Sequence, residues 1–191
     1  MPTRNPKVYL AGPDVFFPNP VEVGRRKKAI CERHGLKGLY PLDNEVTASD
    51  RTQMAMEIFR QNCRLMDEAD AIIANMTPFR GVSMDAGTAF EIGYIRAQGK
   101  PVFAYSDEKE PTDYAGRMRH LNLLADGGGL IDRDGLAIED FGLPDNLMMV
   151  CAALDSGTTL ITAHDLSGPP TELAIYEECV KRAAVALRAN R

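Results

Sequence analysis

Carboxylates and one tyrosine are the side chains of this sequence that could do chemistry together. Five of them lie within or next to short apolar segments that we predict to be strands: Tyr9, Asp43, Asn44, Glu45 and Asp70. Asp85 and Glu91 lie around the predicted helix that follows the third strand. No serine, cysteine or histidine nucleophile system accompanies them. Carboxylates beside a tyrosine suit substitution at an acetal-like carbon, where one carboxylate attacks and another group manages the leaving group's proton. The pattern therefore favours glycosyl transfer.

Glu91 is the central candidate, and it has two interpretations. Thr88-x-x-Glu91 fits a capping box, in which the glutamate only satisfies a backbone amide at a helix start. The small residues at 86–89 and Gly93 would instead let a ligand approach closely, and the positive helix terminus would keep the carboxylate ionised. We favour the interpretation that Glu91 is a nucleophile.

The other candidates also have structural interpretations. Asp85 could be an ordinary helix N-cap, Asp70 a turn residue at the entry of a strand, and Tyr9 a core aromatic. The basic run at 25–28 could hold a phosphate or form a solvated helix face.

Apolar segments and helical stretches alternate along the chain. The predicted strands lie at residues 7–12, 39–42, 71–76, 102–105 and 159–163. The predicted helices lie at 21–34, 54–65, 86–98, 146–154 and 171–187. Such alternation predicts an α/β fold, namely a flavodoxin-like (Rossmann-like) five-stranded parallel sheet with helices on both faces.

Two predicted helices carry a periodic face. In the second helix the face is Met54, Ile58, Gln61 and Leu65, and in the last it is Leu173, Tyr176, Val180, Ala184 and Leu187. We expect one domain over residues 1–191, with a charged, glycine-rich excursion at about 106–143. Ligands of such sheets bind beyond the carboxyl ends of the strands, in the loops at 12–20, 43–50, 75–85 and from Tyr105 onward.

Composition excludes several classes of protein. The 191 residues are 45% apolar and carry 22 Lys and Arg against 27 Asp and Glu, a net charge of −5. This acidic balance disfavours a nucleic-acid polymer or an anionic membrane as partner. Four separated cysteines and three histidines show no metal-ligand spacing, and no signal peptide or membrane span is evident, so we expect a cytoplasmic protein without metal. GxGxxG and GxxxxGK[ST] motifs are absent, which disfavours classical dinucleotide binding and kinase-type chemistry.

Several segments, taken in order, resemble the nucleoside 2-deoxyribosyltransferase family. They are VYLAGPDVF at 8–16, YPLDNE at 40–45, ADAII at 69–73, SMDAGTAFEIGY at 83–94 and GLPDNLM at 142–148. The GTAFEIG block, joined to the YLAGP start and the NLM segment, is the most specific part. The resemblance implies transfer of 2-deoxyribose between nucleobases through a covalent intermediate, with no cofactor.

The resemblance also implies roles for individual residues. Glu91 would be the nucleophile on C1′, Tyr9 would orient and tune it, Asp70 would deliver a proton to the leaving base, and Asp85 would hold the sugar 5′-hydroxyl. Substrate-binding residues would further include Gly12, Phe16, Asp43, Asn44 and Glu45, the last four on the base. A neighbouring subunit would supply Asn146 and Met148, so the functional unit would be a homo-oligomer, a dimer or higher.

Two departures and two rivals remain. The excursion is longer than in compact members of the family, and the chain ends in the tail at 187–191, so no terminal residue is assigned a role. A nucleoside or nucleoside 5′-monophosphate N-glycosidase would keep Glu91 but use water; Asp85 suits a neutral 5′-hydroxyl and would repel a phosphate, whereas Arg80 weakens that argument. A noncatalytic nucleotide-binding module would keep only the pocket.

Overall fold

The five strands form one parallel sheet in the order β2-β1-β3-β4-β5. The structure is a computed structural model that describes residues 4–43, 49–108, 113–125, 130–168 and 171–189. Its strands are β1 (Lys7–Ala11), β2 (Lys37–Leu39), β3 (Ala71–Asn75), β4 (Val102–Tyr105) and β5 (Leu160–Ile161). This order is that of flavodoxin-like doubly wound proteins, so the predicted fold class is confirmed.

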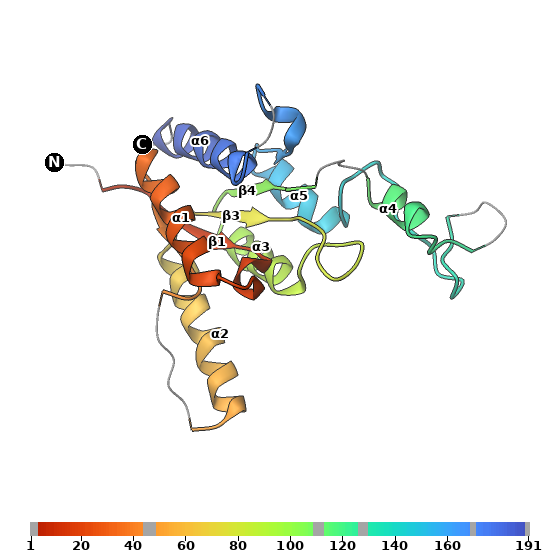
Figure 1. Ribbon diagram of the computed structural model, residues 1–191, viewed down its shortest axis with the longest axis horizontal. Coiled ribbons are helices and arrows are strands. Elements are labelled where there is room, and N and C mark those ends of the chain that lie inside the picture. The colour runs from red at the N-terminus through yellow and green to blue at the C-terminus, as the bar shows by residue number, and fades with distance from the viewer. Residues whose placement is uncertain (1–3, 44–48, 109–112, 126–129, 169–170, 190–191) are drawn as a thin grey trace.

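Helices cover both faces of the sheet (Figure 1). One face packs against α1 (Pro20–Arg33) and α6 (Ala174–Ala189). The other packs against α2 (Arg51–Glu68), α3 (Ala86–Ala97) and α5 (Leu147–Asp155). Successive strand side chains point to opposite faces, so Tyr9 and Leu10 enter different cores.

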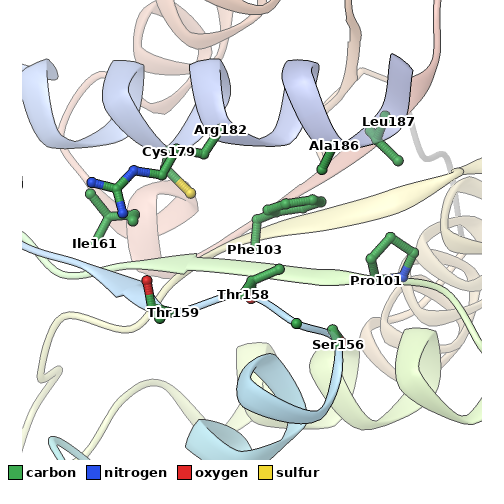
Figure 2. Close-up of a pocket in the computed structure, with 11 residues that line it drawn as sticks. Pro101, Phe103, Ser156, Thr158, Thr159, Ile161, Cys179, Arg182, Ala186 and Leu187 are labelled. Carbon is green, nitrogen blue, oxygen red and sulfur yellow. The ribbon is translucent and has the colours of Figure 1, made fainter. Parts of the chain in front are cut away.

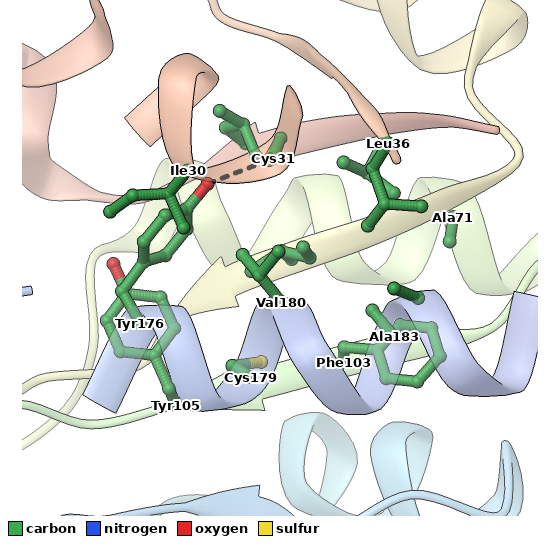
Figure 3. Close-up of a cluster of buried hydrophobic side chains, with 14 of the residues drawn as sticks. Ile30, Cys31, Leu36, Ala71, Phe103, Tyr105, Tyr176, Cys179, Val180 and Ala183 are labelled. Atoms are coloured by element: carbon green, nitrogen blue, oxygen red, sulfur yellow. Dashed lines mark hydrogen bonds between the residues drawn. The ribbon is translucent and has the colours of Figure 1, made fainter. Parts of the chain in front are cut away.

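The core under α6 is apolar but holds a buried polar contact. Figure 3 shows Tyr176 of α6 packed edge-on against Tyr105 of β4, with ring centroids 5.5 Å apart. The Tyr176 hydroxyl lies 3.0 Å from the Cys31 sulfur of α1. This contact pairs buried polar atoms from two helices, and the buried Lys27 ammonium group of α1 lies 5.0 Å from the centroid of the Tyr176 ring.

Several element boundaries differ from the sequence prediction, most clearly in β2, β5 and α6. β2 ends at Leu39 rather than residue 42, because the Asp43 amide closes a turn onto the Tyr40 carbonyl and Pro41 has no amide proton to donate. β5 is shorter than predicted. α6 begins at Ala174 rather than 171, because Leu173 has φ 63°, which no right-handed helix accepts.

Helix α2 projects away from the sheet, as Figure 1 shows. On its periodic face Met54 and Ile58 are 37% and 43% exposed, and Met66 near its end is the one buried residue of this helix. The sheet is too short to cover the first half of this 18-residue helix. An apolar helix surface is therefore left uncovered by the described part of this chain.

The excursion at 106–143 contains α4 (Tyr114–His120) and two isolated antiparallel bridges, Leu124 with Asp132 and Ile131 with Ala137. The remaining elements are two short 3-10 helices, η1 (Pro13–Phe16) and η2 (Ala163–Asp165). None of the described helices is long and apolar enough to cross a bilayer.

Candidate active site

A cavity of about 470 Å³ opens beside the carboxyl ends of β1 and β2. It is lined by Gly12, Val15, Phe16, Pro41, Leu42, Ile58, Gln61, Asn62, Asp85, Gly87 and Glu91. The strand order reverses between β1 and β3, and ligands of such sheets bind at that point. Four predicted site residues, Gly12, Phe16, Asp85 and Glu91, come together in this cavity from two segments that are far apart in the sequence.

Glu91 is held by Tyr9. The Tyr9 hydroxyl, fully buried on β1, donates a hydrogen bond to Glu91 Oε1 at 2.5 Å. Helix α3 begins one residue after its N-cap Asp85, so Thr88 lies inside the helix and cannot cap it. The capping-box interpretation of Glu91 is therefore wrong, and its carboxylate faces Tyr9 and the cavity.

The surroundings of Glu91 shift its ionisation. Burial raises the pKa of Glu91 to about 7, the charge of Asp85 adds to the rise, and the hydrogen bond from Tyr9 opposes it. Burial outweighs the stabilisation of the charge expected from the helix terminus, so Glu91 ionises less readily than an exposed glutamate. Burial, followed by the charge of Glu91, raises the pKa of Tyr9, so the phenol stays protonated and acts as a donor.

Asp85 serves two purposes at once. Its Oδ2 accepts hydrogen bonds from the Thr88 amide at 3.0 Å and the Thr88 hydroxyl at 3.2 Å, which caps α3. It also lines the cavity beside Gly87 and Glu91. The capping interpretation and the binding interpretation are therefore compatible.

An exposed aromatic ring, that of Phe16 in η1, also lines the cavity. Phe16, 55% exposed, stacks on Phe79 with ring centroids 5.4 Å apart and planes 14° apart. The Arg80 guanidinium carbon lies 5.1 Å from the Phe16 centroid and 4.6 Å from that of Phe79. This packing fixes an exposed ring at the cavity, where it could stack on a planar ligand.

Two amide side chains of α2 were not predicted as site residues. Gln61 and Asn62 line the cavity, and Asn62 Oδ1 is buried without a hydrogen-bond partner among the described residues. An unpaired buried oxygen favours a ligand that donates to it. Gln61 did stand on the periodic face of the predicted helix, between Ile58 and Leu65, and a polar residue at that position was the available signal.

Asp70 is not part of the site. Its carboxylate accepts hydrogen bonds from Arg4 and from the Lys7 amide, both at 2.7 Å, at the amino-terminal edge of the sheet. The length of β3, about 16 Å for five residue steps, separates Asp70 from the carboxyl edge at Asn75. The prediction that Asp70 delivers a proton to the leaving base is therefore wrong.

Other predicted residues lie away from the cavity or outside the described residues. Asp43 does not line the cavity; it turns toward the Lys28 ammonium group and accepts from the Tyr40 amide at 2.9 Å. Asn44 and Glu45 lie outside the described residues. Asn146 caps α5 by accepting from the Met148 amide, and neither residue lines the cavity. Their assignment to a neighbouring subunit stays a prediction.

A second cavity, of about 270 Å³, lies between α6 and strands β4 and β5 (Figure 2). Arg182 in its lining already pairs with Asp165 and Glu178. Burial raises the pKa of the Cys179 thiol, which disfavours the nucleophilic thiolate. Within the described residues, no group of three or more His, Cys, Asp or Glu could hold a metal ion. The cavity with Glu91 is therefore the better candidate for chemistry.

Comparison with known proteins identifies the family of the chain. The profile of the family described as nucleoside 2-deoxyribosyltransferase matches residues 8–148. An uncharacterized protein of Schizosaccharomyces pombe is 32% identical, over 77% of this chain and 76% of that protein. A solved 2-deoxyribosyltransferase from Leishmania mexicana is 34% identical with a TM-score of 0.58, over 75% of this chain and 85% of that one. A conserved protein from Enterococcus faecalis V583, 18% identical with a TM-score of 0.54, shares the fold over 93% of this chain and 98% of that one.

Proposed function

Because the chain belongs to the nucleoside 2-deoxyribosyltransferase family, we propose that it moves 2-deoxyribose between nucleobases through a covalent intermediate on Glu91. The observation that carries this proposal is the Glu91 carboxylate, which lines the cavity, is held by Tyr9 at 2.5 Å and has its pKa raised by burial to about 7. The cavity, at about 470 Å³, falls within the range of small-molecule sites.

The first displacement forms a sugar ester. The ionised Glu91 carboxylate attacks C1′, a C1′–O bond forms, and the C1′–N bond breaks with its electron pair moving to the base. The base takes a proton from solvent, because Asp70 lies at the far edge and the amides of Gln61 and Asn62 do not ionise. Tyr9 keeps its proton and orients the attacking carboxylate.

The second displacement reverses the first. A nitrogen of the incoming base attacks C1′ from the face the first base left, the ester C1′–O bond breaks, and Glu91 regains its negative charge. The incoming base loses one proton to solvent. Two inversions at C1′ give retention of configuration.

The residues that line the cavity suggest that the sugar and the base bind on different sides of it. Asp85 beside Glu91 would accept a hydrogen bond from the sugar 5′-hydroxyl. The apolar side of Phe16, Leu42 and Ile58 would receive the base, and the amides on α2 would pair with its polar edge. This division supports a nucleoside as the substrate, because a 5′-phosphate would stand against the Asp85 carboxylate.

The proposed functional unit is a homo-oligomer in which Asn146 and Met148 complete a neighbour's site. Its support is surface chemistry: Met148 is 71% exposed, and the Phe59 and Phe90 rings, 5.9 Å apart, lie half-exposed on α2 and α3. Phe59→Glu should lower the sedimentation coefficient toward that of a monomer. An unchanged coefficient would remove this surface from the interface.

An exchange assay tests the proposal. Purified protein is mixed with 2′-deoxyinosine and free adenine or cytosine, and products are separated by chromatography beside a base-free control and Glu91→Ala. New deoxynucleoside that depends on Glu91 is expected. Release of hypoxanthine without exchange would replace transfer by hydrolysis. If neither exchange nor base release occurs with deoxynucleosides or their monophosphates, the proposed catalysis fails and the protein would be a noncatalytic binding module.

A further inference from the structure

Arg117 links the excursion to the loops around the cavity. It lies on α4 and its side chain is only 8% exposed. Its Nε donates to the Val82 carbonyl at 2.7 Å, Nη1 donates to Glu108 Oε2 at 3.0 Å, and Nη2 donates to the Pro144 carbonyl. One guanidinium thus joins the loop before α3, the segment after β4 and the loop before α5.

Asp145 connects the loop before α3 with the start of α5 by hydrogen bonds of its own. Only 2% exposed, it accepts at Oδ1 from the Ser83 hydroxyl at 2.5 Å and from the Asn146 amide at 2.7 Å. Its Oδ2 accepts from the Met84 amide at 2.8 Å and lies 4.0 Å from Arg117 Nη2. The carboxylate is therefore buried, hydrogen-bonded at both oxygens and close to a buried cation.

We propose that Asp145, held beside Arg117, is a positioning residue for deoxyribosyl transfer that fixes Asp85 at the cavity. The inference rests on the proposed function. Met84, whose amide Asp145 binds, directly precedes Asp85, so this bond sets where the Asp85 backbone enters α3. The bond to Asn146 fixes the first turn of α5 at the same time. The excursion supplies Arg117 to this arrangement.

The arrangement requires a carboxylate at position 145. Three donors converge on its two oxygens, from Ser83, Met84 and Asn146. An asparagine offers one acceptor oxygen and turns an NH2 group toward the remaining donor. Lysine at 117 cannot reproduce the planar fork that reaches Val82, Pro144 and Glu108 together.

The first test compares matched pairs of variants. Asp145→Asn and Arg117→Lys should raise the KM for the deoxynucleoside and lower kcat/KM by on the order of 10- to 100-fold, because small misplacements of a binding group are costly. Asp140→Asn and Arg119→Lys make the same changes in an exposed pair, 3.4 Å apart, of the same segment and should leave both constants unchanged. Equal effects in the two pairs would overturn the inference.

A double-mutant cycle separates positioning from general loss of structure. Asp85→Ser keeps a helix-capping oxygen but withdraws the carboxylate from the cavity. If Asp145 acts through Asp85, then Asp145→Asn should cost little further kcat/KM in the Asp85→Ser background. Additive losses would overturn the inference. Arg117→Lys in the same cycle keeps the test decisive if Asp145→Asn fails to fold.

Hydrogen exchange makes the inference independent of activity. Amides at residues 83–88 should exchange faster in Asp145→Asn than in wild type, with no change in Asp140→Asn. If wild type shows neither transfer nor hydrolysis, the proposed function fails and this measurement still decides whether Asp145 holds the segment. Unchanged exchange at 83–88 would overturn the positioning role.

Discussion

Replacing Tyr9 with phenylalanine should move the acid limb of the pH profile to higher pH. The Tyr9 hydroxyl lies 2.5 Å from Glu91 Oε1 and stabilises the ionised carboxylate. A hydrogen bond to a charged group contributes about 1.5–3 kcal/mol. Each pKa unit corresponds to about 1.4 kcal/mol, so its loss should raise the pKa of Glu91 by roughly 1–2 units.

The assay is base exchange measured as kcat/KM from pH 5 to pH 10. Since attack needs ionised Glu91, the wild-type rate should fall as the pH drops through about 7. The limb of Tyr9→Phe should lie roughly 1–2 pH units higher, while the alkaline plateau changes by less than about tenfold, because α3 still holds Glu91 in place. Tyr40→Phe is the matched control, since that hydroxyl is buried and has no hydrogen-bond partner among the described residues.

Two results would refute this reasoning. If the acid limb of the wild-type pH profile lay near the ordinary pKa of a glutamate, burial would not control the pKa of Glu91. If Tyr9→Phe lowered the rate equally at every pH, Tyr9 would orient the carboxylate without tuning its ionisation. A shift of the limb in Tyr40→Phe would show that the change comes from general loosening of the core.

Three further variants test other parts of the structure. Burial raises the pKa of Glu91 from 4.5 to about 7, so the stability that protonated Glu91 contributes is lost as the pH rises through 7. At pH 8.5 the free energy of unfolding of Glu91→Gln, measured by calorimetry, should therefore exceed that of wild type by about 1–3 kcal/mol. The difference should shrink at pH 5. Lys27→Met should lower the free energy of unfolding in urea by about 3–5 kcal/mol, because it leaves Asp14 buried without its cation; Asp14→Asn in the same chain should restore part of it. Asn62→Ala should raise the KM for the acceptor base by about 3- to 10-fold with little change in kcat, measured by acceptor saturation, and an unchanged KM would place the base elsewhere.

Local pattern was enough to predict the sheet and to single out Glu91, which lines the cavity. Short apolar runs located all five strands, and β4 has the predicted bounds at both ends. Glu91 could be identified because its helix start is marked by small residues and a capping aspartate close to it in sequence. Such signals are local, so a sequence displays them without knowledge of the fold.

Residues that act through distant partners could not be placed from sequence. Asp70 lies near the start of an apolar run, but only the fold shows that this is the amino edge of the sheet. Lys27 stands in a basic run that predicted a solvated face or a phosphate site, yet it is 1% exposed and pairs with Asp14 at 2.5 Å. Asn62 becomes a site residue only because α2 passes over the cavity.

Each side of the cavity is held by a buried polar residue that does not itself line the cavity. Lys27 binds Asp14 and the Tyr105 hydroxyl, which anchors the loop that carries Phe16. That loop packs so tightly that a Cβ on Gly12 would lie 2.5 Å from Asp14 Oδ2.

Tyr9 holds Glu91, the proposed nucleophile, and Asp145 holds the entry to Asp85. Substitution at C1′ requires the carboxylate, the sugar and the base to be positioned to within fractions of an ångström. These buried hydrogen bonds hold the binding groups of the cavity in place before substrate binds. Disturbing any one of them should therefore slow transfer without removing a group that touches the substrate.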